Sequence, residues 1–302
     1  MNRGWIYREQ VKCPDAGSTV LDYYTQRYRH SSRDDWHHRI AAGQVLLNDQ
    51  AIAPETLLQP GQWLAYHRPP WQEPEVPLEF EVLHEDEDLL VIAKPAGLPV
   101  LPGGGFLDHT LLGQLHQIYP QDTPVPIHRL GRGTSGLMLL ARSPLAKAYL
   151  SQQLRKRQIH KVYRALVGAG DMPDQFTITQ AIGKLPHPVL GYIYGASPDG
   201  LFSHSDVQVL KRKPSSTLLE VTILTGRPHQ IRIHLAFAGF PLLGDPLYGV
   251  GGIPVLQSSS EAGNFPVPGD CGYHLHAYHL GFIHPKTGNF IRITCPAPLE
   301  LD

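Results

Sequence analysis

The sequence predicts a fold that combines helices and strands in two domains. Val20 to Tyr28 carries apolar residues at helical spacing, whereas Thr217 to Leu224 alternates and is rich in β-branched residues, as strands are. A proline- and glutamate-rich stretch, residues 69–77, indicates a stiff, extended linker. We therefore expect a small domain over residues 1–75 and a larger one over residues 76–302.

Composition sets limits on location and partners. The formal net charge of −1 gives no global sign of nucleic-acid binding, so any RNA contact must come from a local patch. Three widely spaced cysteines (Cys13, Cys271 and Cys295) favour a reducing cytoplasm over a disulfide framework. No apolar run is long enough for a bilayer, and the first residues lack the apolar region of a signal peptide. We expect a cytoplasmic protein without a membrane partner.

The small domain is expected to hold two helices followed by short strands. Ser31 to Asp35 offers an N-cap for a second helix over Trp36 to Ala42. A short apolar strand, Val45 to Leu47, then leads through a turn at residues 48–50 to a last strand over Trp63 to His67.

The larger domain opens with a charged run, His84 to Asp88, which we interpret as a solvated turn before a strand over Leu89 to Ala93. The segment Lys94 to Val100 (KPAGLPV) follows, and its two prolines and glycine predict a rigid turn that presents Lys94. Thr110 to Ile118 returns to helical spacing.

Later elements follow from the same local signals. They are a helix from Ser143-Pro144 to about Gln158, a strand over Lys161 to Val167, hairpin strands within residues 171–206, a helix opening at His229, a surface loop over residues 250–272, and two strands within His274 to Pro296.

The central segment, Ile127 to Arg142, reads IHRLGRGTSGLMLLAR, a glycine-rich turn that opens into a buried strand. Backbone N–H groups and cations in such a turn can bind an anion. The glycines also match a dinucleotide-binding pattern, but Pro124 and Pro126 precede them and a strand follows. After the glycines no Asp or Glu appears until Asp171, too far along the chain for a ribose-binding acid, so the context of that pattern is missing.

A block of single-sign charge surrounds this segment. From Thr123 to Gly170 there is no acidic residue, and a solvated helix face usually mixes signs. We interpret the block as a surface that binds RNA phosphates. Its cations are Arg129, Arg132, Arg142, Lys147, Arg155, Lys156, Arg157, Lys161 and Arg164.

Three motifs in order, KPAGLPV, HRLGRGTSG and TGRPHQIRIHL with GDPLYG, resemble those of the RluA-type RNA pseudouridine synthases. The resemblance covers residues 76–302 and implies an α+β fold, a mixed and mostly antiparallel sheet flanked by helices, with a basic cleft. It implies isomerisation of specific uridines in structured RNA, either rRNA or tRNA, without a metal, nucleotide or other cofactor. We expect the chain to act as a monomer.

The pattern of residues 1–75, with Gly43, Val45 and Asn48, resembles the small RNA-binding module that often precedes such domains. A generic helical cap domain is the alternative.

The resemblance also implies roles for individual residues. Tyr163 matches the aromatic residue that stacks on a flipped base, and Arg232 matches the arginine that pairs with the catalytic carboxylate. The motifs and the basic block together predict the substrate-binding residues Lys94, His128, Arg129, Arg132, Thr134, Arg155, Lys156, Arg157, Lys161, Arg227 and His229. For His128 and Thr134 a turn-stabilising role is equally open. We expect Tyr163 to line the cleft and to stay outside the hydrophobic core.

Gly131 stands where the family has its catalytic aspartate, and glycine has no group for that chemistry. Either another acid fills the site, with Asp108 and the more structural Asp245 as candidates, or the chain is a catalytically silent RNA-binding homologue. In either case we expect Arg232 to have a substitute acid or access to water. Cys271, His274 and His276 depart from known zinc-ligand spacings, so we predict no metal.

Overall fold

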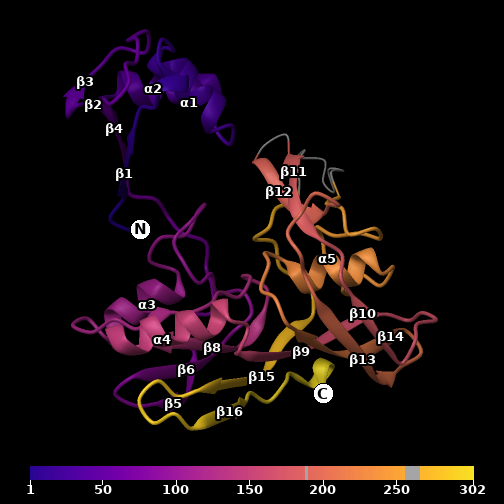
Figure 1. Ribbon diagram of the computed structural model, residues 1–302. Helices are drawn as coiled ribbons and strands as arrows, with labels where there is room; N and C mark the ends of the chain where they lie inside the picture. Colours follow the sequence, from indigo (N-terminus) through magenta and orange to yellow (C-terminus); the bar gives the residue numbers. More distant parts are fainter. Residues whose placement is uncertain (188–189, 256–265) are drawn as a thin grey trace. The chain divides into compact units, whose positions relative to one another are not determined.

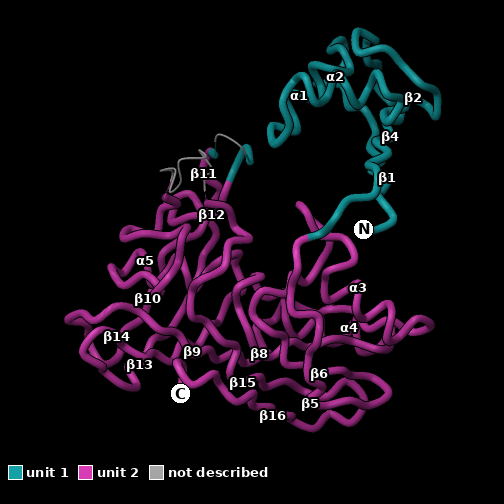
Figure 2. The backbone as a smooth tube through the Cα atoms, turned by 180° about the vertical axis from the view of Figure 1, so that it is seen from behind, with its two compact units in different colours: residues 1–73, 187–192 teal, residues 74–186, 193–302 magenta. Residues whose placement is uncertain are grey.

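The computed structural model describes residues 1–187, 190–255 and 266–302, and the chain forms two compact units (Figure 2). One comprises residues 1–73 with 187–192, and the other residues 74–186 with 193–302. Part of the surface loop expected over residues 250–272 lies outside the described residues. Within the described ranges, no helix combines the length and apolar character needed to cross a bilayer.

The first unit packs two helices on a four-stranded sheet of order β1-β4-β2-β3. Both predicted helices are confirmed. Each begins at a side-chain cap: Thr19 accepts from Asp22 N–H, and Ser32 forms a capping box with Asp35. Strand β1 was not predicted, since most of its residues are exposed on both faces and carry no apolar alternation. The elements are β1 (Trp5–Gln10), α1 (Val20–Arg27), α2 (Arg33–Ala41), β2 (Val45–Leu47), β3 (Gln50–Ala51) and β4 (Trp63–Arg68).

The second unit is built on a ten-stranded sheet (Figure 1). Strands β15 and β8 are parallel where they pair, and the other neighbouring strands for which a register is described are antiparallel, which confirms the predicted mixed, mostly antiparallel α+β fold. The order is β10-β13-β14-β9-β15-β8-β6-β5, with β16 beside β15 and β7 beside β8. The strands are β5 (Glu81–Glu85), β6 (Leu89–Lys94), β7 (Val125–Pro126), β8 (Ser135–Ala141), β9 (His160–Gly168), β10 (Gln175–Ile178), β13 (Ser205–Arg212), β14 (Ser216–Ile223), β15 (Leu275–Ile283) and β16 (Phe290–Thr294). A separate hairpin comprises β11 (Ile182–His187) and β12 (Gly191–Ala196).

Three helices accompany this sheet, α3 (Leu111–Ile118) and α4 (Pro144–Arg155) near β6 and β8, and α5 (Gln230–Phe237) toward the other end (Figure 1). Ser143 caps α4, as the local sequence predicts, and Thr110, which was expected inside the helix, caps α3. Helix α4 ends three residues before the predicted Gln158, because Arg157 adopts a left-handed backbone with φ of 58°.

Strands β6 and β8 form the centre of the core and are buried nearly completely over Leu89 to Ile92 and Leu137 to Leu140. Such strands read as continuous apolar runs because neither face meets water. Gly136 lies at the start of β8 with φ of 99°, and a Cβ there would stand 2.3 Å from the Ala277 carbonyl oxygen of β15. This glycine of the central motif is therefore required for the close approach of two strands.

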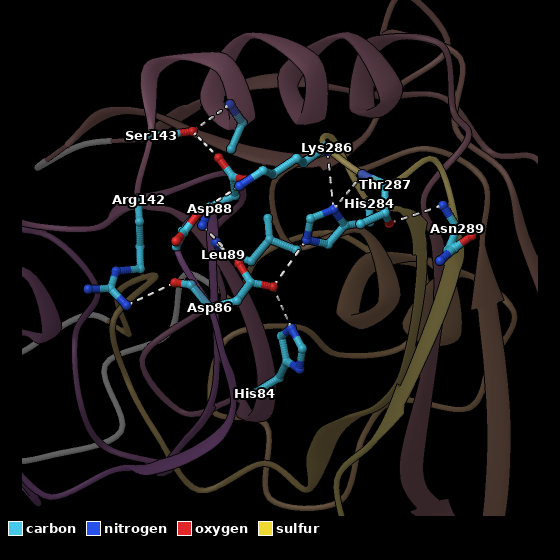
Figure 3. Close-up of polar contacts among 12 residues, drawn as sticks. His84, Asp86, Asp88, Leu89, Arg142, Ser143, His284, Lys286, Thr287 and Asn289 are labelled. Carbon is cyan, nitrogen blue, oxygen red and sulfur yellow. Dashed lines mark hydrogen bonds and ion pairs between the residues drawn. The ribbon is translucent and has the colours of Figure 1, made fainter.

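The charged run at His84 to Asp88 contains the predicted turn before a strand, but the turn is not fully solvated, because Asp86 and Asp88 form a partly buried clasp (Figure 3). Asp86 Oδ1 accepts the N–H groups of Asp88 and Leu89 at 2.8 Å, and its Oδ2 lies 3.0 Å from His84 Nε2 and 3.1 Å from His284 Nε2. Asp88 in turn accepts from Ser143 Oγ at 2.6 Å. The clasp joins the β5–β6 turn, the start of α4 and the β15–β16 turn.

Ligand atoms of Asp86, Asp88 and His284 lie within 4.8 Å of one another, a spacing that a metal ion can use. The hydrogen bonds of His284 argue for a different role. Its Nδ1 accepts the N–H groups of Lys286 and Thr287 at 3.1 and 3.2 Å, so the proton of the ring lies on Nε2 and is donated to Asp86. The geometry is that of a hydrogen-bonded clasp.

Candidate active site

A cavity of about 1370 Å³ opens in the second unit. Its lining comes from residues 99–102, α3, the segment before β8, the end of α4, the start of β9, the end of β14, the loop before α5 with the first turn of that helix, and the segment before β15. The site residues that the sequence analysis selected all line it except Lys94 and Lys156. Those that line it are His128, Arg129, Gly131, Arg132, Thr134, Arg155, Arg157, Lys161, Tyr163, Arg227, His229 and Arg232.

The described lining is strongly cationic. It includes seven Arg and Lys residues, and no Asp or Glu belongs to it among the residues that the structure describes. Burial lowers the pKa of Lys161 to about 8, which leaves it mainly protonated at neutral pH. A ligand that carries several negative charges, such as a nucleic-acid backbone, fits this surface electrostatically.

At the central turn, Tyr273 covers the two glycines Gly131 and Gly133. A Cβ at Gly131 would lie 2.8 Å from Tyr273 Oη and 3.4 Å from Thr134 Oγ1, and a Cβ at Gly133 would lie 2.9 Å from the Tyr273 ring. Gly131 does not have a positive φ, so an L side chain there is opposed by Tyr273 and not by the backbone. Tyr273 was missed by the sequence analysis.

Arg232 meets its expected acid partner in Asp245. Its Nε and Nη2 donate to the two carboxylate oxygens at 2.7 Å each, and both side chains are buried, 3% and 0% exposed. Burial alone would lower the pKa of Arg232, but the hydrogen bonds that it donates to Asp245 outweigh burial and raise the pKa. The guanidinium also stacks on the rings of Tyr273 and Tyr248, at 4.2 and 5.0 Å.

Asp245 fixes Arg232 without reaching the cavity. Its Oδ1 also accepts the N–H groups of Leu247 and Tyr248, at 2.9 and 3.2 Å, and Asp245 is not part of the lining. Asp108, the other candidate acid, does not line the cavity either. Neither candidate therefore stands in the cavity as a replacement for a carboxylate at position 131.

Tyr163 lines the cavity from β9, as expected, but only 7% of it is exposed and it also belongs to the hydrophobic core cluster. The prediction that it stays outside the core is wrong, because a residue on a central strand packs against neighbouring strands even where part of its side chain lines the cavity. Burial raises the pKa of Tyr163, so its phenol is neutral.

His128 and His229 hold the walls of the cavity as neutral rings. His128 Nε2 accepts the Leu139 N–H at 3.2 Å, and burial, helped by Lys161, lowers its pKa to about 3. His229 Nδ1 lies 2.8 Å from Tyr248 Oη, and burial lowers its pKa to about 4. The bond to Leu139 favours the turn-stabilising role for His128.

Lys94 lies beneath the cavity instead of in it, which corrects the expectation that its turn presents it to substrate. It is 1% exposed, and its Nζ donates to the carbonyl oxygens of Pro95, Leu98 and Arg132 at 2.7, 2.9 and 3.2 Å. The Gly97 N–H also donates to the Arg132 carbonyl oxygen, at 2.8 Å. Lys94 thus ties two motif loops together.

His276 and His274 do not gather with Cys271 as zinc ligands in the described contacts. His276 is buried, with Nδ1 2.8 Å from Ser135 Oγ and Nε2 3.2 Å from the Cys295 carbonyl oxygen. Both ring nitrogens thus have protein partners, as expected of a buried polar group in a strand.

Comparison with known proteins matches the site to a family. Residues 88–237 match the model of a family described as RNA pseudouridylate synthase. An uncharacterized RNA pseudouridine synthase of Synechocystis sp. is 53% identical over 93% of this chain and 95% of its own length. RNA pseudouridine synthase 5 of Oryza sativa is 41% identical over 98% and 88%. Ribosomal large subunit pseudouridine synthase D of Neisseria meningitidis is 33% identical over 93% and 75%.

Solved structures agree on the fold. Human RNA pseudouridylate synthase domain containing 1 is similar with a TM-score of 0.57 and 23% identity, over 76% of this chain and 89% of that one. This protein and the human protein therefore share a fold, and the sequence relatives described above establish the family. The chain belongs to the RluA-type family of RNA pseudouridine synthases.

Proposed function

We propose that the protein isomerises a specific uridine of ribosomal RNA to pseudouridine. The observation that carries the proposal is the cationic cavity, which places the aromatic Tyr163 and the buried Arg232 beside the central turn of a family member. Ribosomal RNA is proposed over tRNA because the Neisseria relative is named for the ribosomal large subunit.

The cavity supplies each physical requirement of substrate binding. The target carbon of a stacked uridine is inaccessible, so the base must leave the stack and be held on an aromatic face, which Tyr163 offers. The flanking phosphates need cations at the mouth, where Arg129, Arg155 and Arg157 are exposed.

The first unit is proposed to add RNA affinity. Its two helices carry exposed arginines, among them Arg27 at the end of α1 and Arg33 at the start of α2. Exposed arginines at helix ends can contact phosphates without reading sequence.

A second candidate function is RNA binding without turnover. One observation favours it: no carboxylate belongs to the cavity lining among the described residues, although the reaction class needs a group that stabilises positive charge at the anomeric carbon.

One experiment separates the two functions. Ribosomal RNA from a deletion strain is labelled so that each pseudouridine adds mass, and is compared with RNA from strains carrying wild-type protein. We expect one site to lose its label in the deletion strain and to regain it with the wild-type gene. An unchanged map, together with tight RNA binding by the purified protein, would support the silent homologue.

A further inference from the structure

We propose that the Tyr273 hydroxyl acts in place of a carboxylate at position 131, as the group that faces the sugar and moves protons during isomerisation. This inference rests on the proposed function. It assigns the chemistry to a residue outside the three motifs.

The position of the hydroxyl carries the argument. A side chain at Gly131 would begin 2.8 Å from Tyr273 Oη, so the phenol oxygen occupies the space into which an acid at that position would extend. Tyr273 lines the same cavity as Tyr163 and Arg232. The absence of a side chain at Gly131 therefore leaves room for the Tyr273 hydroxyl.

The surroundings hold the hydroxyl in place. Tyr273 Oη shares a hydrogen bond with Thr134 Oγ1 at 3.2 Å, and the Arg232 guanidinium stacks on its ring at 4.2 Å. The ring is 5% exposed and packs against Gly133. A catalytic group needs such fixed supports on several sides, because small displacements lose much of the rate.

The electrostatics of the cavity suit a neutral acid. Burial raises the pKa of Tyr273, although Arg232 opposes this, so the phenol keeps its proton before reaction. The cations of the lining stabilise the uracil anion that departs when the glycosidic bond breaks. Tyr273 can then supply both the proton for that anion and, as phenolate, a negative charge beside the sugar cation.

The steps balance without a co-reactant. The C1′–N1 bond breaks and its electron pair stays on N1, which takes the phenol proton from Tyr273. The base turns, and the C5=C6 pair forms the C5–C1′ bond while the phenolate faces C1′. The C5 proton then moves to the phenolate oxygen, which restores both the C5=C6 bond and the phenol. The net change is isomerisation alone.

The first test removes only the hydroxyl. Tyr273→Phe keeps the ring against Gly133, and turnover is followed by tritium release from [5-³H]uridine in ribosomal RNA. We expect turnover to fall about 100-fold or more, within the range for a lost acid–base group, while RNA affinity stays within about threefold of wild type. Tyr119→Phe is the matched control, because Tyr119 is outside the cavity lining and should keep wild-type turnover.

Separate outcomes identify which idea fails. If wild-type protein itself releases no tritium, the proposed function and this inference both fail. If wild-type protein turns over and Tyr273→Phe keeps its rate within about threefold, below the range for a lost acid–base group, only the inference is overturned.

The second test exchanges the two groups. Gly131→Asp alone should not increase turnover, because Tyr273 Oη occupies the space that the new side chain needs. Gly131→Asp/Tyr273→Ala makes room for the carboxylate and should exceed Tyr273→Ala by about tenfold or more, given the usual contribution of such a group. A gain from Gly131→Asp with Tyr273 in place, or a double variant no faster than Tyr273→Ala, would contradict a shared position.

Discussion

Arg232 and Asp245 form the most deeply buried ion pair of the described structure. The pair has a structural role and does not supply a catalytic carboxylate. The pair is bidentate, and Arg232 lines the cavity whereas Asp245 does not, so Asp245 fixes the guanidinium against Tyr273 without offering a carboxylate to substrate. The arginine of the family motif is therefore retained with a full partner, although the family's aspartate is absent at Gly131.

Asp245→Asn should destabilise the fold, because a buried guanidinium would lose its countercharge. Removing one partner of a buried pair typically costs about 3–5 kcal/mol, and urea unfolding measures it. Asp174→Asn is the control, since Asp174 bonds Arg212 on the surface with its side chain 85% exposed and should change stability by less than about 1 kcal/mol. Equal unfolding midpoints for both variants would contradict the support role.

Lys94→Met tests whether Lys94, like Asp245, stabilises the fold instead of binding substrate. Three carbonyl oxygens would lose their common donor beneath the cavity, so we expect a loss of about 2–4 kcal/mol, with RNA affinity of the folded protein kept. Lys147→Met, at an exposed position of α4, should be nearly neutral. If Lys94→Met weakened RNA binding and left stability unchanged, Lys94 would be a substrate contact after all.

At the scale of elements, the Asp86 clasp predicts acid sensitivity. Burial raises the pKa of Asp86, but the hydrogen bonds from Asp88, His84, His284 and Leu89 outweigh it and lower the pKa to about 2. The folded state thus favours the carboxylate. Its contribution is complete above the unfolded pKa of about 4 and is lost as the pH falls through about 2.

Asp86→Asn should therefore lower stability by about 1–2 kcal/mol at neutral pH, after allowance for the partial exposure of the carboxylate. The difference from wild type should shrink as the pH falls below about 4. Urea unfolding over a pH series measures both quantities, with Asp174→Asn as a surface control. A stability difference that stays constant down to the lowest pH at which both proteins fold would contradict a stabilising role for the Asp86 carboxylate.

Elements with local signals could be predicted from sequence, and elements defined by distant contacts could not. Ser32 and Ser143 indicate where α2 and α4 begin, because a cap is a contact between near neighbours. Strand β1 gives no such signal, since its residues are mostly exposed and its pairing partner β4 lies far along the chain.

The same distinction holds for the site, where residues in sequence motifs could be predicted and residues placed by distant contacts could not. Nearly all of the site residues selected from the motifs and the basic block line the cavity, because the family places its motif residues at fixed spacings. Tyr273 has no local pattern, and its hydrogen bond to Thr134 spans 139 residues of sequence. Lys94 was placed wrongly for a related reason: a turn motif fixes where its backbone goes, but not whether the side chain points into a cavity or beneath it.

For the whole molecule, charge is distributed so that a nearly neutral protein presents a cationic cavity. The formal net charge is −1, yet seven Arg and Lys residues line the cavity and no acid does so in the described chain. RNA binding should therefore release counterions from a local surface, and affinity should fall steeply with salt although the total charge is small.

Arg155→Ala/Arg157→Ala measures that footprint, because both arginines are exposed at the cavity. If each contacts a phosphate, the slope of log K against log salt should become shallower by about 1.4–1.8, at roughly 0.7–0.9 per contact. Lys211→Ala/Lys213→Ala removes the same charge away from the cavity lining and should leave the slope nearly unchanged. Lys156→Ala, next to both arginines but outside the lining, should have a smaller effect than either single arginine variant. Equal slope changes for the two double variants would mean that net charge, and not the cavity, governs RNA binding.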